Sequence, residues 1–294
     1  MNNTFCLSFS DTAFQLLHIE SDDNEKIIKS NHHINYSSPK SPDQIFNSES
    51  IAFVSSSINE LKEEKGLENF SLSVTLPFNF ADIKKVAFPN HSNKEQKRAQ
   101  IEWELKTTLP GNLKEYKISV LNEFDESSFS SAVVVAIKKE LLLKLKKVAD
   151  ETKGQIENVF LNCFALENYI LHDNRYADDK NFAFLKVNRN TLEYHFFNAK
   201  KYFLSQIDSM DLSSRNKQEV VLELTHERYK NISNLFGQAQ NEKTFELYLY
   251  GCSMNEEIFS SLKNGLSIPV ERARINNFPG QDDYKYVEAW GSIL

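Results

Sequence analysis

The alternation of apolar and polar residues divides the chain into two similar halves. At the start of the chain, apolar residues at every second position predict three strands, near 5–9, 14–18 and 27–34. Apolar residues at helical spacing between 51 and 61 predict a helix, which Gly66 can end. A further strand is predicted at 70–76. The first half therefore begins with three strands, a helix and a strand.

Residues from about 78 to 137 are predicted to form an insertion with its own small sheet and one helix. Ser92 and Glu95 have the spacing of a capping box, so the helix is expected to start there. The run 131–137 predicts a buried strand, and a helix that ends at Gly154 follows it. The insertion helix carries three apolar residues on one side, Ile101, Leu105 and Leu109.

The second half repeats the succession of the first. Three strands are predicted again, at 182–187, 192–197 and 202–207. A helix, a strand at 245–250, a helix and a last helix near 284–294 follow. Three strands, a helix, a strand and a helix, occurring twice, indicate an α/β fold that arose by internal duplication. We expect a first domain at 1–172 and a second at 173–294, with the last helix packing back on the first.

Bulk composition is that of a folded, globular protein. A chain of 294 residues with 40% hydrophobic residues can bury two moderate cores. Its net charge of −7 disfavours nucleic acid and anionic membranes as partners. The N-terminus has no signal-peptide pattern, and no apolar stretch has the roughly 18 residues that would cross a bilayer. A cytoplasmic protein without direct membrane insertion is the expectation.

Metal and nucleophile motifs are weak throughout the sequence. The three cysteines are far apart and share no ligand spacing, so neither disulfides nor a zinc site is predicted. His226 starts a zinc-peptidase-like helix pattern but lacks the second histidine, and a buried core histidine is expected. His32 and His33 point to opposite sides of a strand. We predict no metal, and no cofactor.

Five segments stand out by their order and spacing, and they are Thr75-Leu76-Pro77, Val86-Ala87-Phe88-Pro89, Ala99-Gln100-Ile101-Glu102-Trp103-Glu104-Leu105 with Leu109-Pro110, Val135-Ala136-Ile137-Lys138-Lys139-Glu140 and Ala289-Trp290-Gly291-Ser292-Ile293-Leu294. They resemble segments of the actin-like ATPase superfamily, most closely its pilus-assembly members, the PilM family. A bacterial family of unknown function with a degenerate actin-like fold is similar too. The resemblance implies two ribonuclease H-like (actin-like) domains of duplicated βββαβα plan, with a small α+β insertion in the first.

The resemblance also implies where a nucleotide would bind. Active members carry the motif D-x-G-x-x-[ST]-x-K in the first hairpin, whose acid organises Mg²⁺ and whose glycine lets backbone amides approach the phosphates. Each of these four positions holds a residue of another type in the matching segment, in which Asp11 and Thr12 form the turn. The four positions hold Ser8, Ser10, Ala13 and Gln15.

The two other nucleotide-binding turns of the family are also altered. The second hairpin should begin with an acid followed by a glycine two residues later, but those positions hold Lys186 and Asn188. Asn188 and Asn190 can still form a tight turn. The third turn should contain a Gly-Gly pair, and one glycine survives in Gly251-Cys252-Ser253, where a structural role for that glycine is favoured. The resemblance therefore implies a degenerate nucleotide cleft.

We expect a non-catalytic actin-like scaffold, a pseudo-ATPase that binds another protein. By resemblance, the partner is a membrane-associated assembly component, held near the insertion at a surface around Trp103. Ile101 and Leu105 are expected to pack the insertion's own core instead. The alternative is an ATP-binding protein or ATPase of the actin or pilus-assembly type, with Asp11 or Asp208 in an altered metal site. A third hypothesis is a polymerising subunit.

Overall fold

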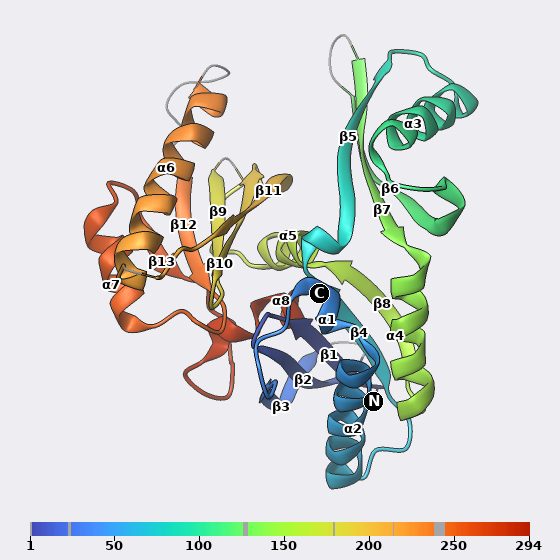
Figure 1. Cartoon of the computed structure of the whole chain (residues 1–294), viewed down its shortest axis with the longest axis vertical. Helices are drawn as coiled ribbons and strands as arrows, with labels where there is room; N and C mark the ends of the chain where they lie inside the picture. The colour runs from blue at the N-terminus through green and yellow to red at the C-terminus, as the bar shows by residue number, and fades with distance from the viewer. Residues whose placement is uncertain (1, 23–24, 126–128, 179, 214, 238–244) are drawn as a thin grey trace. The chain divides into compact units, whose positions relative to one another are not determined.

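The computed structural model describes residues 2–22, 25–125, 129–178, 180–213, 215–237 and 245–294 (Figure 1). The chain forms two compact units. The first unit comprises Met1–Ile45, Gly66–Pro77 and Gly154–Leu294, and the second unit comprises Phe46–Lys65 and Phe78–Lys153. The predicted division between 172 and 173 does not coincide with a bound of these units, because the first unit contains strands from both halves of the chain. That division stays a prediction.

The first sheet of the first unit has five strands in the order β3-β2-β1-β4-β8. Its first three strands are antiparallel neighbours, and β4 and β8 continue the sheet in parallel with β1. The strands are β1 (Asn2–Phe9), β2 (Ala13–Ser21), β3 (Lys26–Asn35), β4 (Ser71–Leu76) and β8 (Gln155–Leu161). The strands predicted from alternation in this half are all present, and β8 is an addition to them.

The second sheet of the first unit has the order β11-β10-β9-β12-β13. It also combines three antiparallel strands with two parallel ones. Its strands are β9 (Asn181–Val187), β10 (Thr191–Asn198), β11 (Lys201–Ser209), β12 (Phe245–Tyr250) and β13 (Val270–Arg272). The predicted α/β class is confirmed, since helices accompany both sheets.

Helices of the first unit cover its sheets and join them. They are α1 (Pro42–Ile45), α5 (Asn162–His172), α6 (Lys217–Gly237), α7 (Glu256–Gly265) and α8 (Val287–Gly291), with the 3₁₀ turn η3 (Asp283–Lys285). One buried cluster draws on both sheets and on α5 and α8, and includes Cys6, Leu17, Leu166, Phe184, Tyr250 and Val287. The two sheets therefore share a hydrophobic core.

The C-terminal segment lies against the first sheet. Ser73 Oγ of β4 donates to the carbonyl of Ser292 at 2.9 Å, and Thr75 Oγ1 donates to the carbonyl of Glu288 at 3.2 Å. Helix α8 also approaches α5 so closely that a Cβ at Gly291 would lie 2.0 Å from the carbonyl oxygen of Ala165. Glycine is required here because any side chain would collide with backbone.

The second unit holds the insertion. Its three-stranded antiparallel sheet has the order β5-β7-β6. The elements are α2 (Ser48–Lys65), η1 (Phe78–Phe80), β5 (Ala81–Pro89), α3 (Lys94–Thr108), η2 (Leu113–Glu115), β6 (Tyr116–Asp125), β7 (Phe129–Lys138) and α4 (Lys139–Thr152). Helix α3 packs on this sheet through a core that includes Val86, Phe88, Ile101, Leu105, Tyr116 and Val134.

Two helix ends differ from the prediction. The capping box of α3 is formed by Asn93 and Gln96, one residue later than the predicted pair of Ser92 and Glu95. Ser92 Oγ instead donates to the carbonyl of Pro89 at 2.8 Å and closes the turn after β5, which leaves Asn93 as the N-cap. Helix α4 ends at Thr152, and its C-cap, Lys153 in place of the predicted Gly154, adopts the left-handed conformation with φ 58°.

Candidate functional site

The first hairpin, between β1 and β2, satisfies its own polar groups. Ser8 and Gln15 are directly opposite each other in the strand register, and Ser8 Oγ donates to Gln15 Oε1 at 3.0 Å. Ser10 N–H donates to the carbonyl of Ala13 at 2.9 Å, and Ser10 Oγ accepts from the Ala13 N–H at 3.1 Å. Hydroxyl and amide groups thus bond to one another at the positions where the resemblance expects phosphate ligands.

The second hairpin, between β9 and β10, is closed in a similar way. Asn188 N–H donates to the carbonyl of Thr191 at 3.0 Å, and its side-chain Nδ2 donates to Glu193 Oε1 at 2.6 Å. Asn188 is buried, whereas Asn190 is exposed. Lys217, in the first turn of α6, donates to the carbonyl of Asn188 at 2.8 Å. The hairpin persists without the acid and glycine of the motif.

The third predicted turn follows β12 and depends on one glycine. Gly251 has φ +104°, and a Cβ there would lie 3.0 Å from the carbonyl oxygen of Val187 in β9. Ser253 N–H donates to that same carbonyl at 3.1 Å. Gly251 therefore allows close approach between two strand ends, which is a structural reason for its presence.

All three predicted turns meet in the first unit. Lys186 Nζ of β9 donates to the carbonyl of Phe9, at the end of β1, at 3.1 Å. Gln15 Nε2 donates to Cys252 Sγ in the third turn. His33 Nδ1 lies 3.8 Å from the same sulfur. The three segments matched through the resemblance are thus neighbours in space.

A buried ion pair occupies the centre of this region. Lys186 Nζ lies 2.8 Å from Glu288 Oε2, and both side chains are only 3% exposed. Glu288 Oε1 accepts two further hydrogen bonds, from the hydroxyl of Tyr250 at 2.8 Å and from Asn162 Nδ2 at 3.1 Å. Asn162 Nδ2 also donates to Glu193 Oε2 at 2.8 Å. One lysine and two carboxylates are therefore linked into a single buried network.

Charges within this network shift one another's protonation. Burial alone would lower the pKa of Lys186, but the carboxylates of Glu193 and Glu288 outweigh burial and raise it. Burial would raise the pKa of Glu193, yet Lys186 and His195, with two amide hydrogen bonds, lower it. Burial raises the pKa of Glu288. Lys186 opposes this rise, whereas the negative charge of Glu193 adds to it. Glu193 is thus the carboxylate that holds its negative charge more firmly.

His195 borders the network and is buried as the neutral ring. Its Nδ1 lies 2.8 Å from Ser205 Oγ, and its Nε2 lies 3.9 Å from Glu193 Oε2. Burial lowers the pKa of His195 to about 3, while Glu193 opposes the shift and Lys186 adds to it. The imidazole is therefore uncharged at neutral pH.

The acids proposed for an altered metal site have different surroundings. Asp208 pairs with Arg228, whose Nε donates to Asp208 Oδ2 at 2.7 Å, so its carboxylate is already compensated. Asp11 is half-buried, and its Oδ1 has no hydrogen-bond partner among the described residues. Thr12 is half-buried as well, and its carbonyl accepts from the N–H of Tyr36 at 2.9 Å. His226 is exposed on α6, so the prediction of a core histidine is wrong.

Among the residues that the structure describes, no group of three or more histidine, cysteine, aspartate or glutamate side chains is arranged to hold a metal ion. All three cysteines are free thiols. Cys6 and Cys163 are buried, and Cys252 is half-buried.

Glu193, Glu288 and Asn162 were not predicted from the sequence. Glu193 lies between Leu192 and Tyr194 in a strand that is buried on both faces, so alternation gave it no distinct position. Glu288 lies between two apolar residues, Val287 and Ala289, of the last helix. An acid flanked by apolar residues on both sides is a signal of burial, and burial of an acid requires a partner. That signal predicts a buried ion pair, but it does not identify Lys186 as the partner.

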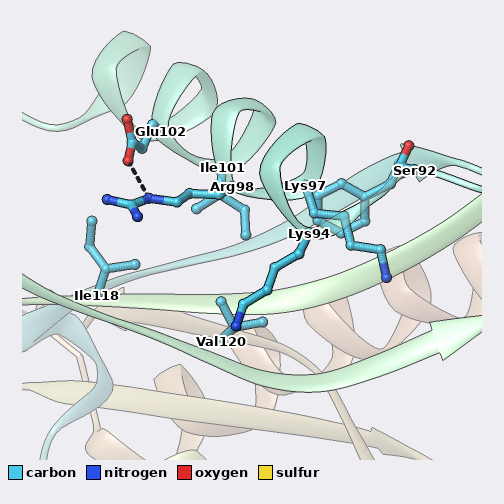
Figure 2. Close-up of a pocket in the computed structure, with 9 residues that line it drawn as sticks. Ser92, Lys94, Lys97, Arg98, Ile101, Glu102, Ile118 and Val120 are labelled. Atoms are coloured by element: carbon cyan, nitrogen blue, oxygen red, sulfur yellow. Dashed lines mark hydrogen bonds and ion pairs between the residues drawn. The ribbon is translucent and has the colours of Figure 1, made fainter.

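A second candidate site lies in the second unit, between α3 and β6. It is a groove of about 600 Å³, within the volume range of ligand pockets, and Figure 2 shows its residues. Its apolar floor is formed by Phe88, Ile101, Ile118 and Val120. The remaining lining residues are polar, and they are Ser92, Lys94, Lys97, Arg98 and Glu102.

Trp103 is 59% exposed on α3 but does not line this groove. Ile101 is 7% exposed and Leu105 is fully buried, and both belong to the core of the insertion. The expectation that these two residues pack internally agrees with their positions, while Trp103 remains a candidate for the partner surface.

Comparison with known proteins rests on structure alone, since no family model and no curated protein matches the sequence. A chain of the PilM–PilN type IV pilus biogenesis complex matches with a TM-score of 0.75 at 16% identity, over 99% of this chain and 97% of that one. A Bacteroides thetaiotaomicron protein with an actin-like ATPase fold and unknown function matches with a TM-score of 0.52 at 10% identity, over 99% and 95%. The chain has an actin-like ATPase fold.

Another actin-like match is the cytoplasmic domain of EpsL from Vibrio cholerae, an inner membrane component of the type II secretion system. Its TM-score is 0.52 at 11% identity, over 93% of this chain and 91% of that one. The PilM-like resemblance read from the sequence is thus confirmed at the level of the actin-like fold. Within the described part of the chain, no helix has both the length and the apolar character of a membrane span.

Proposed function

We propose that this chain is a non-catalytic actin-like scaffold that binds another protein, and that its nucleotide site is degenerate. The buried Lys186–Glu288 pair is the observation that carries the proposal. Lys186 stands where the resemblance expects the second magnesium-organising acid, and a cation at that position repels Mg²⁺. Its ammonium group is already engaged by Glu288 and by the carbonyl of Phe9.

Both hairpins support this proposal. The side chains at the motif positions bond to one another, as Ser8 does with Gln15 and as Asn188 does with Glu193. A phosphate group would have to compete with these internal hydrogen bonds and would meet the carboxylates of the buried network. Each charge-assisted contact that a triphosphate loses removes roughly 1.5 to 3 kcal/mol of binding energy. Several such losses together would abolish useful affinity.

Two structurally similar proteins belong to named assemblies, and these assemblies suggest the class of partner. One matching chain belongs to a complex of PilM with PilN, and another is part of an inner membrane component of a secretion system. We propose by analogy that this chain acts in the cytoplasm on a protein of a membrane-associated assembly. We further propose that its two sheets, which share one strand order, belong to duplicated ribonuclease H-like halves.

A thermal-shift titration with Mg-ATP tests the silent cleft. We expect no change in Tm for this chain, whereas an actin-like protein with demonstrated ATP binding should be stabilised in the same buffer. A ligand at a hundred-fold excess over its dissociation constant stabilises a protein by about 2.7 kcal/mol. A magnesium-dependent rise in Tm that disappears in the Asp11→Asn variant would instead support the ATPase alternative.

A further inference from the structure

The groove between α3 and β6 combines an apolar floor with a positively charged wall. Lys94, Lys97 and Arg98 lie three and four residues apart, so they share one face of α3. Figure 2 shows them above the strand that carries Ile118 and Val120. Among the described residues that line the groove, the single carboxylate is that of Glu102, which is 2.9 Å from Arg98 Nε. The groove is therefore positive in a chain whose net charge is −7.

The positions of these cations on α3 strengthen the positive potential. Lys94 is the first residue of the helix, and Lys97 and Arg98 are in its second turn. Cations at a helix N-terminus are unfavourable because the helix dipole already places partial positive charge there. Lys94 is exposed and has no ion-pair partner among the described residues, so its charge is available to a ligand.

The floor and the neighbouring strand favour a peptide over a small anion. Val120 is 46% exposed, which is high for a large apolar side chain that points into a groove. A free anion would leave this apolar surface uncovered, whereas apolar side chains of a peptide would cover it. Strand β6 is also an outer strand of its sheet in the described part of the second unit, and an extended segment can lie along such an edge.

We infer that this groove binds an acidic, apolar segment of a partner protein. Isoleucine, leucine or phenylalanine side chains of the segment would contact Ile118 and Val120, and its aspartate or glutamate side chains would pair with Lys94, Lys97 and Arg98. The inference rests on the proposed function, because it names the chemistry of the partner that the scaffold holds. The opposite signs of the groove and the segment supply the specificity.

A random twelve-residue peptide library displayed on phage, panned against the full chain, tests this inference. We expect the enriched peptides to combine acidic and large apolar residues. In a synthetic version of an enriched peptide, exchange of its aspartate and glutamate for asparagine and glutamine should weaken binding about tenfold or more at low salt. The difference should shrink as salt screens the charges.

Two matched variants locate the binding. Lys94→Glu should weaken the acidic peptide about tenfold, yet it should not unfold the chain because an acid is favourable at a helix start. Lys117→Glu introduces the same charge change on β6, at an exposed position that alternates with Ile118, and should leave binding unchanged. Thermal denaturation of both variants checks that they remain folded.

The outcomes separate the two proposals. Enrichment of neutral or basic peptides whose binding is lost in Val120→Glu would overturn the acidic partner while leaving a protein-binding scaffold. Enriched acidic peptides that bind Lys94→Glu as well as the unmodified chain would also overturn this inference. A library that yields no peptide sensitive to Val120→Glu would overturn the groove, while a protein-binding scaffold that acts through another surface, such as that around Trp103, would stand.

Discussion

Lys186 is the only charged residue of a strand that is buried along its whole length. A buried charge is tolerated when it is paired and hydrogen-bonded, and Lys186 meets that condition through Glu288 and the carbonyl of Phe9. The same contacts tie β9 to α8 and to the end of β1. Lys186, which stands where the resemblance expects a magnesium-organising acid, is therefore a structural residue of the buried core.

Removing the charge of Lys186 should destabilise the chain strongly. In Lys186→Met, Glu288 and Glu193 lose their counter-charge, and a broken buried pair costs about 3 to 5 kcal/mol. Urea unfolding measures the loss, with Lys29→Met as the control, because the Lys29–Glu20 pair is on the surface and is worth about 1 kcal/mol or less. The double variant Lys186→Met with Glu288→Met should recover part of the stability. Equal effects of Lys186→Met and Lys29→Met would contradict a buried ion pair.

His195 should make the chain less stable as the pH falls. Its pKa is about 3 in the folded chain and near 6.5 when unfolded, so below pH 6.5 only the unfolded chain binds this proton. The free energy of unfolding should then fall by up to ~1.4 kcal/mol per pH unit relative to His195→Gln. Urea unfolding at pH 5.0, 5.5, 6.0 and 7.5 measures the difference.

The other titratable groups of the network are present in both the unmodified chain and His195→Gln, so the difference between the two pH profiles reports on His195. Because the pKa of Glu193 is lowered, Glu193 reduces the free energy of unfolding only as the pH falls below about 4.5. Because the pKa of Glu288 is raised, Glu288 increases the free energy of unfolding as the pH falls towards about 4.5. Parallel pH profiles for the unmodified chain and His195→Gln would show that the imidazole is not buried in its neutral form.

At the scale of elements, local hydrogen bonds decide where α3 begins. Asn93 and Gln96 exchange side-chain and backbone hydrogen bonds across the first turn, while Ser92 bonds outside the helix. The Ser-x-x-Glu pattern one residue earlier is equally good in sequence. Ser92 is hydrogen-bonded in the turn after β5, so the next residue, Asn93, is the N-cap.

The register of this cap can be measured. Asn93→Ala should cost about 1 kcal/mol of stability, since an N-cap side chain is lost. Ser92→Ala should cost clearly less, because Ser92 Oγ bonds only the carbonyl of Pro89. Thermal unfolding of the two variants gives the comparison, and a larger effect for Ser92→Ala would favour the earlier cap.

At the scale of the whole molecule, the two five-stranded sheets of the first unit are joined by a hydrophobic core and by a polar network. The buried cluster takes residues from both sheets, and the Lys186–Glu288 pair connects β9 with the helix that packs on β4. The second sheet also packs with α6 and α7 in a cluster without residues of the first sheet, but the opposite face of its strands belongs to the shared cluster. The two halves of the chain are therefore expected to unfold together.

Hydrogen exchange tests this cooperativity. Amides in β1 and β9 should lose protection at the same urea concentration, because both become exposed in one opening of the first unit. The three-residue edge strand β13 should exchange earlier and serves as an internal reference. Loss of protection in β9 well before β1 would show that the two sheets unfold independently.

Local patterns were sufficient for most of the fold. Apolar patterns predicted every strand of the two five-stranded sheets except β8 and β13, and the order of weak motifs predicted an actin-like fold with an insertion. Strand β8 escaped detection because its apolar residues, Ile156 and then 159–161, do not alternate, and helix α5 follows it directly without a turn signal. Strand β13 has only three residues, too few to establish a period.

The sequence by itself determined that serine, lysine and asparagine stand at the positions where the resemblance expects the acid and the glycine of each hairpin motif, because residue identity is visible without coordinates. Only the tertiary structure decided what those residues do instead. Glu288 lies 102 residues after Lys186, and no periodic pattern relates residues that far apart. Their pairing arises because a last short helix packs against both sheets, where a buried ammonium group can be stabilised only by the carboxylate that folding brings to it.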